Sequence, residues 1–241
     1  MEYTIKIAGD SAVCLEFEQV ISEKTSSSIR LAAESLGKLA IPGIIDVIPT
    51  FCALLINYDP LAIDYDQICQ RLNASLLNIN EVDLKIKHIV EIPVCYGGEY
   101  GPDIDFVAEH AGLSVEEVIA IHCGRDYLID MLGFLPGFAY LGGLDSRIHS
   151  PRLEAPRTRV EPGAVGIGGA QTGIYPLASP AGWRIIGNSP VRPYDPDREK
   201  PILYKAGDFI RFVPISAEEY ARIEAEVADG TYECTFLTEG V

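Results

Sequence analysis

Polar and aromatic side chains of the kind that bind small anions or amides crowd into a glycine- and proline-rich stretch in the second half of the sequence. These residues are Arg157, Thr158, Arg159, Gln171, Thr172, Tyr175, Trp183 and Arg184. Arginine forks bind carboxylates in a bidentate manner, and amide or hydroxyl donors on rigid loops orient a small substrate. The alternative is that Arg157 and Arg159 are solvated strand residues and Trp183 fills a core. As a group, the residues favour a binding or catalytic site.

The same stretch contains the GxxxxG spacing of a phosphate-binding loop, at Gly168 and Gly173. Such a loop needs Lys and Ser or Thr directly after its second glycine, followed by a helix whose N-terminus holds the phosphate. Here the run Ile-Tyr-Pro follows Gly173, and further proline and glycine come soon after, so this helix cannot form. A dinucleotide fingerprint fails as well, because Gln171 stands where its third glycine should be. The spacing therefore indicates tight turns rather than a nucleotide site.

Among the four histidines, His122 is the candidate for acid–base chemistry. The others are His88, His110 and His149, and no spacing between histidines and cysteines is typical of metal ligands. His122 stands at the end of a predicted helix, just before the glycine-rich half of the chain. The alternative is a polar residue favoured at that position by the helix dipole. We expect no metal site.

A second unusual stretch, GFLPGFAYLGGLD (residues 133–145), carries three large aromatic side chains between glycines. Exposed, it would form an apolar patch of the kind that marks a protein interface. Phe134, Phe138 and Tyr140 are therefore candidates for a subunit interface, and packing inside the molecule is the alternative.

Composition restricts the classes of partner and the compartment. The 241 residues carry a net charge of −16, which argues against nucleic acid and anionic membranes, because both need a surface rich in Lys and Arg. The six cysteines are scattered singly in apolar surroundings, as expected of buried free thiols in a reducing compartment. Neither a signal peptide nor an apolar run of membrane-spanning length is recognisable. We expect a cytoplasmic protein.

The first part of the chain has the pattern of a small α+β domain. Strand-like segments occupy YTIKIAG, AVCLEFE, GIIDVIPTFCALLINY (two strands) and KHIVEIPVCY, while residues 22–40 and 64–79 have apolar residues at helical spacing. This pattern predicts a domain of split βαβ, ferredoxin-like type over residues 1–95.

Residues 98–132 look helical, with a capping box at Ser114 and Glu117 and a possible further short helix in RDYLIDMLGF. Residues 133–193 then hold half of the 22 glycines and half of the 16 prolines, which excludes helices and predicts short strands and turns. A strand, DFIRFVPI, and a capped helix, SAEEYARIEAEVADG, follow. The sequence thus predicts a mainly-β domain, barrel or sandwich, over residues 96–241.

Long, ordered motifs resemble a known family. IPVCYGGEYGPDIDFVAEHAGLSVEEVIAIHCGRDYLIDMLGFLPGFAYLGGLD, PRLEAPRTRVEPGAVGIGGAQTGIYPLASPAGWRIIGNSP and AGDFIRFVPISAEEY are similar to the core of the family of 5-oxoprolinase B subunits. That family also includes the histidine-kinase inhibitor KipI and the first-subunit-type domain of allophanate hydrolase and urea carboxylase. The likeness covers roughly residues 90–220 closely and the N-terminal half more loosely. Ala139 and Ala181 stand where the family often has proline and usually has glycine.

The resemblance implies an N-terminal α+β domain followed by a cyclophilin-like β-barrel, and a protein that acts with others. The implied partners are the C-type (KipA-type) and A-type subunits of 5-oxoprolinase, with which such chains hydrolyse 5-oxoproline to glutamate at the expense of ATP. ATP with Mg²⁺ is then a co-substrate, and no tightly bound cofactor is expected. A regulatory role as an inhibitor of a sensor histidine kinase remains open. A relative of the urea carboxylase portion acting with biotin ranks last, because no biotin-acceptor domain is recognisable.

Under this resemblance, the motif residues receive roles. Arg157, Gln171, Tyr175 and His122 are expected to be catalytic, and Arg159, Thr172, Trp183 and Arg184 are expected to bind substrate or nucleotide. The arginines would supply positive charge for the substrate carboxylate and for developing phosphate charge, while the amide and hydroxyls orient the lactam.

Overall fold

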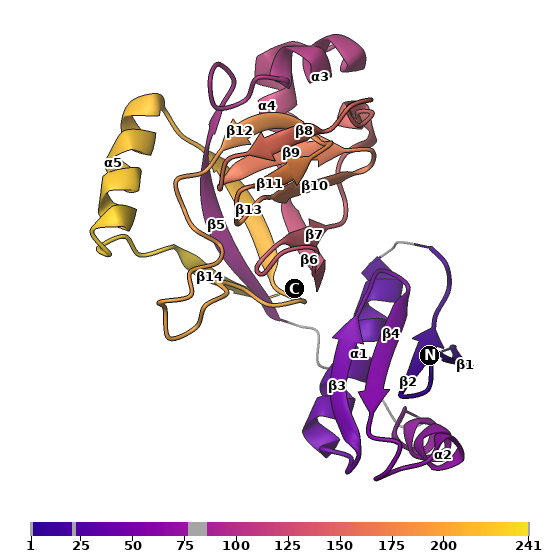
Figure 1. Cartoon of the computed structure of the whole chain (residues 1–241). Helices are drawn as coiled ribbons and strands as arrows, with labels where there is room; N and C mark the ends of the chain where they lie inside the picture. Colours follow the sequence, from indigo (N-terminus) through magenta and orange to yellow (C-terminus); the bar gives the residue numbers. More distant parts are fainter. Residues whose placement is uncertain (1, 21–22, 77–85, 241) are drawn as a thin grey trace. The chain divides into compact units, whose positions relative to one another are not determined.

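The computed structural model describes residues 2–20, 23–76 and 86–240 and divides the chain into two compact units, shown in Figure 1. The first unit runs to Ile86, and the second comprises Lys87–Gly240. This division lies at the start of a long strand, β5 (Ile86–Tyr96), which belongs to the sheet of the second unit, and the boundary suggested by the sequence lies at the other end of the same strand. In the part of the chain that is described, no helix is long and apolar enough to cross a membrane.

The first unit is a four-stranded antiparallel sheet with two helices. Its elements are β1 (Thr4–Ile7), β2 (Ala12–Glu16), α1 (Glu23–Leu39), β3 (Ile44–Pro49), β4 (Ala53–Tyr58) and α2 (Tyr65–Leu76). Alternate residues of β2 and β4 point into the core of this unit. Val13, Leu15, Leu54 and Ile56 are fully buried and cluster with apolar residues of both helices. The expected helical residues 22 and 77–79 lie outside the described part of the chain.

The strand order of this unit is β1-β2-β4-β3, so β4 lies between the two strands that α1 connects. A ferredoxin-like unit would place beside β2 a strand that follows the second helix. Here β1, from the N-terminal hairpin, takes that edge, and the strand after α2 is part of the other unit. The complete ferredoxin-like topology expected from the sequence is therefore not reproduced.

The second unit contains most of the strands. After β5 come α3 (Ile104–Ala111), α4 (Val115–Cys123), β6 (Asp126–Leu132), β7 (Ala139–Leu141), the 3₁₀ helix η2 (Ser146–Ile148), β8 (Arg157–Val160), β9 (Ala164–Gly168), β10 (Gln171–Ile174), β11 (Ser179–Ala181), β12 (Arg184–Asn188), β13 (Phe209–Pro214), α5 (Ala217–Ala228) and β14 (Phe236–Gly240). The capping box at Ser114 and Glu117 is confirmed at the start of α4. A matching capping box at Ser216 and Glu219 begins α5.

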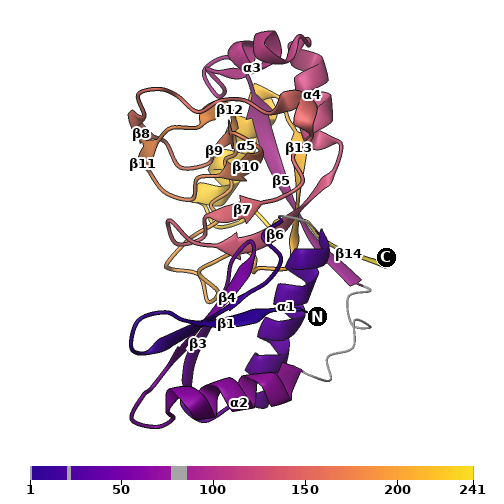
Figure 2. The ribbon, with the colours of Figure 1, turned by 90° about the vertical axis from the view of Figure 1, so that its right-hand side faces the viewer.

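Seven of these strands form the expected barrel. The sheet order is β12-β9-β10-β7-β6-β13-β5-β14, and an additional pairing between β12 and β5 closes the ring and leaves β14 as an appended edge. Closure occurs where Gly187 pairs with Tyr96 and Asn188 with Cys95. In both views, α3 and α4 lie at one end of the barrel (Figures 1 and 2). Closing the sheet pairs the edges that an open sheet would leave exposed.

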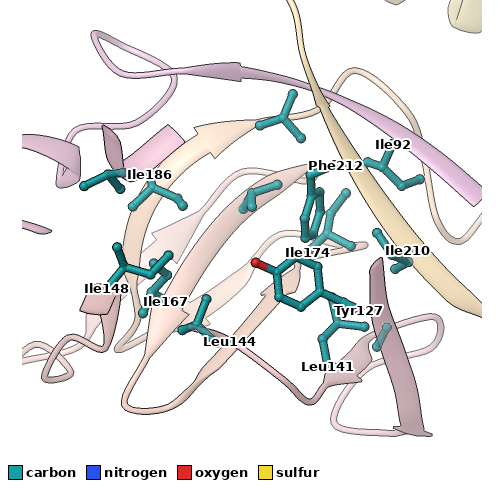
Figure 3. Close-up of a cluster of buried hydrophobic side chains, with 14 of the residues drawn as sticks. Ile92, Tyr127, Leu141, Leu144, Ile148, Ile167, Ile174, Ile186, Ile210 and Phe212 are labelled. Atoms are coloured by element: carbon teal, nitrogen blue, oxygen red, sulfur yellow. The ribbon is translucent and has the colours of Figure 1, made fainter. Parts of the chain in front are cut away.

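Large apolar side chains fill the barrel, including Tyr127, Ile174 and Phe212, as Figure 3 shows. Residues 126–132 form the strand β6 between β13 and β7, so the helix considered for RDYLIDMLGF is wrong. Its consecutive buried residues, Tyr127 to Asp130, are covered on both faces, a pattern that periodicity cannot distinguish from a buried helix.

A two-stranded ribbon of β8 and β11 lies outside the barrel sheet and covers a second, smaller core. That core contains Phe138, Val160, Ala164, Tyr175, Ala181, Trp183 and Ile185. All six cysteines are free, but only Cys95 is buried and the other five are partly exposed, so the expectation of buried thiols holds for one of them.

Candidate functional site

The glycines of the β9–β10 hairpin make room for the indole of Trp183. Gly168 pairs with Gln171, and Gly166 pairs with Gly173, across the two strands. A Cβ on Gly168 would lie 2.3 Å from Nε1 of Trp183, and one on Gly173 would lie 3.2 Å from its Cζ3 atom. These strands therefore need glycine because the tryptophan ring packs directly on the backbone. The GxxxxG spacing has this steric cause.

Trp183 is the centre of an aromatic cluster on the outer face of the barrel sheet. Its ring lies 5.7 Å from Phe138 and 6.1 Å from Tyr175 between centroids, and Phe138 and Tyr175 are 5.2 Å apart, all in edge-to-face geometry. The three rings are buried, with Val160 and Ala181 of the ribbon in the same core. Edge-to-face contacts of this kind fix ring positions and give the site a rigid apolar floor.

Polar groups lie at the edge of this cluster. The guanidinium carbon of Arg152 is 5.9 Å from the Trp183 ring centroid. Burial raises the pKa of Tyr175 to about 12, and the nearby positive charge of Arg152 opposes that rise. Tyr175 is therefore a neutral hydroxyl donor near pH 7. Gln171 is half-buried and shares the face of Gly168, because directly paired residues of antiparallel strands project to the same side.

Sequence reasoning does not single out Arg152. The dipeptide Pro-Arg occurs twice in PRLEAPRTR, at Arg152 and Arg157, and only Arg157 is among the predicted site residues. This repeated dipeptide is a weak signal, because nothing in the spacing ranks one arginine above the other.

His122 and Thr172 lie on the opposite side of the same sheet, inside the barrel. The Tyr96 hydroxyl is 2.7 Å from Nδ1 of His122, and Nε2 is 2.8 Å from Oγ1 of Thr172. The Thr172 hydroxyl also donates to the Gly166 carbonyl oxygen at 3.1 Å. Complete burial lowers the pKa of His122 to about 3, so the imidazole is neutral. These two predicted site residues are thus enclosed and hydrogen-bonded to one another.

The three predicted arginines diverge. Nη2 of Arg157 donates to Oδ1 of buried Asp103 at 2.8 Å, and Oδ2 of Asp103 accepts from the Ile185 N–H at 2.7 Å. Arg159 pairs with Glu161 at the surface, which holds the pKa of that carboxyl below its usual value. The Arg184 guanidinium stacks 3.6 Å from the ring centroid of Phe106 on α3. The Arg157–Asp103 ion pair ties the ribbon to β12 and to the residue before α3. Nη1 of Arg157 also donates to the Trp183 carbonyl oxygen at 3.5 Å, but among the described residues none of these three guanidinium groups lies over the Trp183 ring as that of Arg152 does.

A pocket of about 600 Å³ lies between the ribbon, β12 and α5. Among its lining residues are Arg157, Arg159, Arg192, Glu99, Glu161 and Glu224. The arginines and glutamates are equal in number, and Arg157 and Arg159 already have carboxylate partners. Since a polyphosphate needs an excess of positive donors, the charges of this pocket do not favour one.

The loop predicted as an interface is divided between surface and core. Phe134 is 61% exposed and has a φ of 59°, an uncommon conformation for a bulky residue. Its ring packs edge-to-face on Phe138, which is buried in the aromatic cluster. Tyr140 is half-buried beside it. Only Phe134 thus presents a largely free aromatic surface.

Comparison with known proteins identifies the family. The description "Carboxyltransferase domain, subdomain C and D" matches residues 3–204. A Bacillus subtilis protein named as the B subunit of 5-oxoprolinase is 40% identical over 236 residues, which is 94% of this chain and 98% of that protein. The protein of the same name from Escherichia coli O157:H7 is 40% identical over 86% of this chain and 94% of its own length. The chain belongs to the family of 5-oxoprolinase B subunits.

Solved structures show a similar fold. A conserved uncharacterized protein from Pyrococcus horikoshii is 45% identical, covers 90% of this chain and all of its own, and superposes with a TM-score of 0.54. The urea carboxylase of Kluyveromyces lactis covers 99% of this chain with a TM-score of 0.81, while this chain covers 24% of that enzyme. At 20% identity, the second comparison concerns the fold alone.

Ala139 and Ala181, the two positions expected to depart from the family pattern, are both accommodated. Ala139 is fully buried on β7, and Ala181 is buried in the aromatic core. Ala181 is not among the described residues with positive φ, so the turn before Trp183 does not need glycine at this position. Among the described residues, no group of three or more His, Cys, Asp or Glu side chains is arranged to hold a metal ion.

Proposed function

We propose that this chain is the B subunit of an ATP-dependent 5-oxoprolinase complex, which hydrolyses 5-oxo-L-proline to L-glutamate together with A-type and C-type (KipA-type) subunits. The observation that carries the proposal is 40% identity over almost the entire length of a protein that bears the name of this subunit. We place the complex in the cytoplasm, and we take the second unit to be the cyclophilin-like barrel of this family.

A five-membered lactam is a poor electrophile, which is why ATP is needed. Transfer of the terminal phosphoryl group to the lactam oxygen, with loss of ADP, makes the ring carbon reactive. Water then adds to that carbon, the ring C–N bond breaks, and the nitrogen takes up a proton, which leaves an acyl phosphate of glutamate. A second water hydrolyses this acyl phosphate to glutamate and inorganic phosphate. The protein must hold the carboxylate, orient the lactam and stabilise negative charge that develops during these steps.

In this proposal the outer aromatic face serves the substrate. Tyr175 and Gln171 donate hydrogen bonds to the lactam, and Trp183 supports its ring. Arg157 acts through structure, because its ion pair with Asp103 ties the ribbon to the start of α3, and Arg159 and Arg184 likewise have partners already. His122 and Thr172 hold the strands from inside the barrel. Phosphate groups of MgATP are then bound mainly by the partner subunits.

The test is reconstitution. The chain is mixed with its A-type and C-type partners, and glutamate and ADP are measured with 5-oxoproline and ATP present, with each component omitted in turn. We expect stoichiometric glutamate and ADP that require all three chains. Absence of turnover, combined with tight binding to a histidine-kinase dimerisation domain, would replace the enzyme role with that of a kinase inhibitor. Gln171→Ala and Tyr175→Phe are expected to slow turnover, and a variant with unchanged turnover removes that residue from the site.

A further inference from the structure

Arg152 is an arginine of the site region whose charge remains available. Arg157 and Arg159 form ion pairs with carboxylates, and Arg184 stacks on Phe106. Within the described part of the chain, Arg152 forms no ion pair with a carboxylate, and its side chain is exposed over the ring of Trp183. A guanidinium with free donors beside an apolar floor is suited to a small carboxylate.

The backbone on both sides of Arg152 is held in place. Ser150 and Gly169 exchange two hydrogen bonds, of 3.2 and 2.8 Å, and the Leu153 N–H donates to the Gly182 carbonyl oxygen at 2.7 Å. Nε of Arg184 donates to the carbonyl oxygen of Pro151 at 3.3 Å. The segment is therefore attached to the β9–β10 turn at one end and to the turn before Trp183 at the other. Such anchoring reduces the entropy lost when the side chain binds a ligand.

Donors of different chemistry share this face of the sheet with Arg152. Tyr175 lies in the aromatic cluster close enough for the charge of Arg152 to act on its hydroxyl, and Gln171 projects from the strand that seats the indole. 5-Oxoproline carries one carboxylate and one lactam on a compact ring. A cationic fork matches the carboxylate and neutral donors match the lactam, while the buried rings of the aromatic cluster form the floor behind the compact ring.

We propose that Arg152 binds the carboxylate of 5-oxoproline, with Tyr175 and Gln171 beside the lactam and Trp183 beneath the ring. This assignment rests on the proposed function for the choice of substrate. It places recognition of the substrate carboxylate in this chain, on the outer aromatic face, and not in the pocket between the ribbon and α5. Arg184 is then a positioning residue, because it holds the Pro151 carbonyl next to Arg152.

Steady-state kinetics of the reconstituted complex provide the first test. We expect Arg152→Gln to raise KM for 5-oxoproline roughly ten- to hundredfold, because charge-assisted hydrogen bonds to the carboxylate are lost, while KM for ATP stays unchanged. Arg152→Lys keeps the charge and loses the fork, so its KM should lie between the two. Arg71→Gln, which removes an exposed arginine of α2 in the first unit, is the matched control and should behave as wild type.

Competition by pyrrolidin-2-one, the same lactam without its carboxylate, tests the pairing directly. Wild type should bind this analogue much more weakly than 5-oxoproline. Arg152→Gln should bind the two almost equally, because the variant no longer has the guanidinium with which the carboxylate interacts. If Arg152→Gln retains the wild-type preference, the proposal is wrong. It is also overturned if Arg192→Gln, in the pocket, raises KM for 5-oxoproline while Arg152→Gln does not.

A binding measurement on the full chain alone separates this inference from the proposed function. Trp183 is the single tryptophan of the sequence, so its fluorescence reports on this site. We expect 5-oxoproline to change the emission of the wild-type chain and of Arg71→Gln, and to have little effect on Arg152→Gln. A saturable change without turnover in the complex would reject the proposed function and keep the carboxylate site. Turnover in the complex with an unchanged KM for 5-oxoproline in Arg152→Gln would keep the proposed function and reject the carboxylate site at Arg152.

Discussion

The two faces of the β9–β10 hairpin show opposite uses of neighbouring residues. Inside the barrel, Thr172 and His122 belong to a closed hydrogen-bonded chain that begins at Tyr96 and ends at the Gly166 carbonyl. On the outside, Gln171 and Tyr175 lie at an aromatic floor beside the surface region of Arg152. A closed set of hydrogen bonds stabilises a fold, whereas an open set can bind a ligand.

Residue type alone does not assign a role in this stretch. Threonine and glutamine are adjacent in the sequence and both could orient a substrate, yet the pleat sends them to opposite faces. Likewise, histidine is the usual candidate for proton transfer near pH 7, but this imidazole is sealed among Tyr127 and Phe212. Mutation of His122 or Thr172 inside the barrel should therefore change stability, whereas mutation of Gln171 outside it should change substrate binding.

The largest effect is expected from His122→Ala. The variant leaves a cavity and removes a partner from the buried hydroxyls of Tyr96 and Thr172, so we expect a loss of about 4 kcal/mol in the free energy of unfolding. Urea denaturation followed by circular dichroism measures it. Gln171→Ala on the outer face is the control and should leave stability unchanged within error. Equal destabilisation by both variants would contradict the division between the faces.

Gly168→Ala tests the seat of the indole from the outer side. Because the added methyl would lie 2.3 Å from Nε1 of Trp183, the ring must move, at a cost of about 3 kcal/mol in stability. The emission maximum of the single tryptophan should shift as well. Gly37→Ala in α1, where no atom lies within 4 Å of the added methyl, should be neutral or slightly stabilising. An unshifted emission spectrum in Gly168→Ala would argue against the close packing.

Arg157 belongs to a partly buried ion pair and Arg159 to an exposed one, so the two should differ in their effect on stability. Arg157→Gln leaves the carboxylate of Asp103 buried without its cation, and we expect a loss of about 2 kcal/mol in the free energy of unfolding. Arg159 and Glu161 are 64% and 66% exposed, so Arg159→Gln should not change stability measurably. Thermal denaturation measures both variants, and the midpoint of Arg157→Gln should be the lower one. Similar midpoints would show that the ion pair with Asp103 does not anchor the ribbon.

The smallest effect concerns pH. The pKa of His122 is about 3 in the folded protein and near 6.5 when unfolded, so below pH 6.5 the unfolded chain binds the extra proton. Stability contributed by the neutral imidazole is thus complete above the unfolded pKa and declines as pH falls. Between pH 7.5 and 5.5 the free energy of unfolding should fall by about 1.4 kcal/mol for this reason.

The matched measurement compares wild type with His122→Asn across this pH range by urea denaturation. Carboxyl groups titrate alike in both proteins, so the difference between the two curves isolates the histidine. The difference should narrow as pH falls from 7.5 to 5.5. A constant difference would mean that His122 takes up a proton in the folded state as readily as in the unfolded state, and that the interior is less closed than described.

Local features of the fold could be predicted from the sequence because their causes are local. The capping residues Ser114 and Glu117 begin α4 as expected, and the glycines and prolines after Gly133 produce short strands and turns. The residues that follow Gly168 and Gly173 are enough to exclude a phosphate loop. The strand β6 could not be distinguished from a helix, because burial on both faces removes the alternation that identifies a strand.

The candidate site could be only partly predicted. Trp183, Tyr175 and Gln171 do come together on one face, but the sequence pattern favours three arginines that have structural partners and does not indicate Arg152. Whether an arginine is available depends on what its guanidinium meets. Asp103, the partner of Arg157, is 54 residues away in the chain, and an even longer stretch separates Arg184 from Phe106.

The sequence by itself determined the family, through long ordered motifs, and most of the strands, turns and helices, β6 excepted, because these depend on residues close together in the chain. Tertiary structure alone decided that β5 belongs to the barrel, that His122 is enclosed 50 residues from its partner Thr172, and which side chains share a face with Trp183. Closure of the barrel fixes an inside and an outside. Whether a side chain lies inside or outside the barrel decides whether its donor is used in a buried hydrogen bond or is available to a ligand.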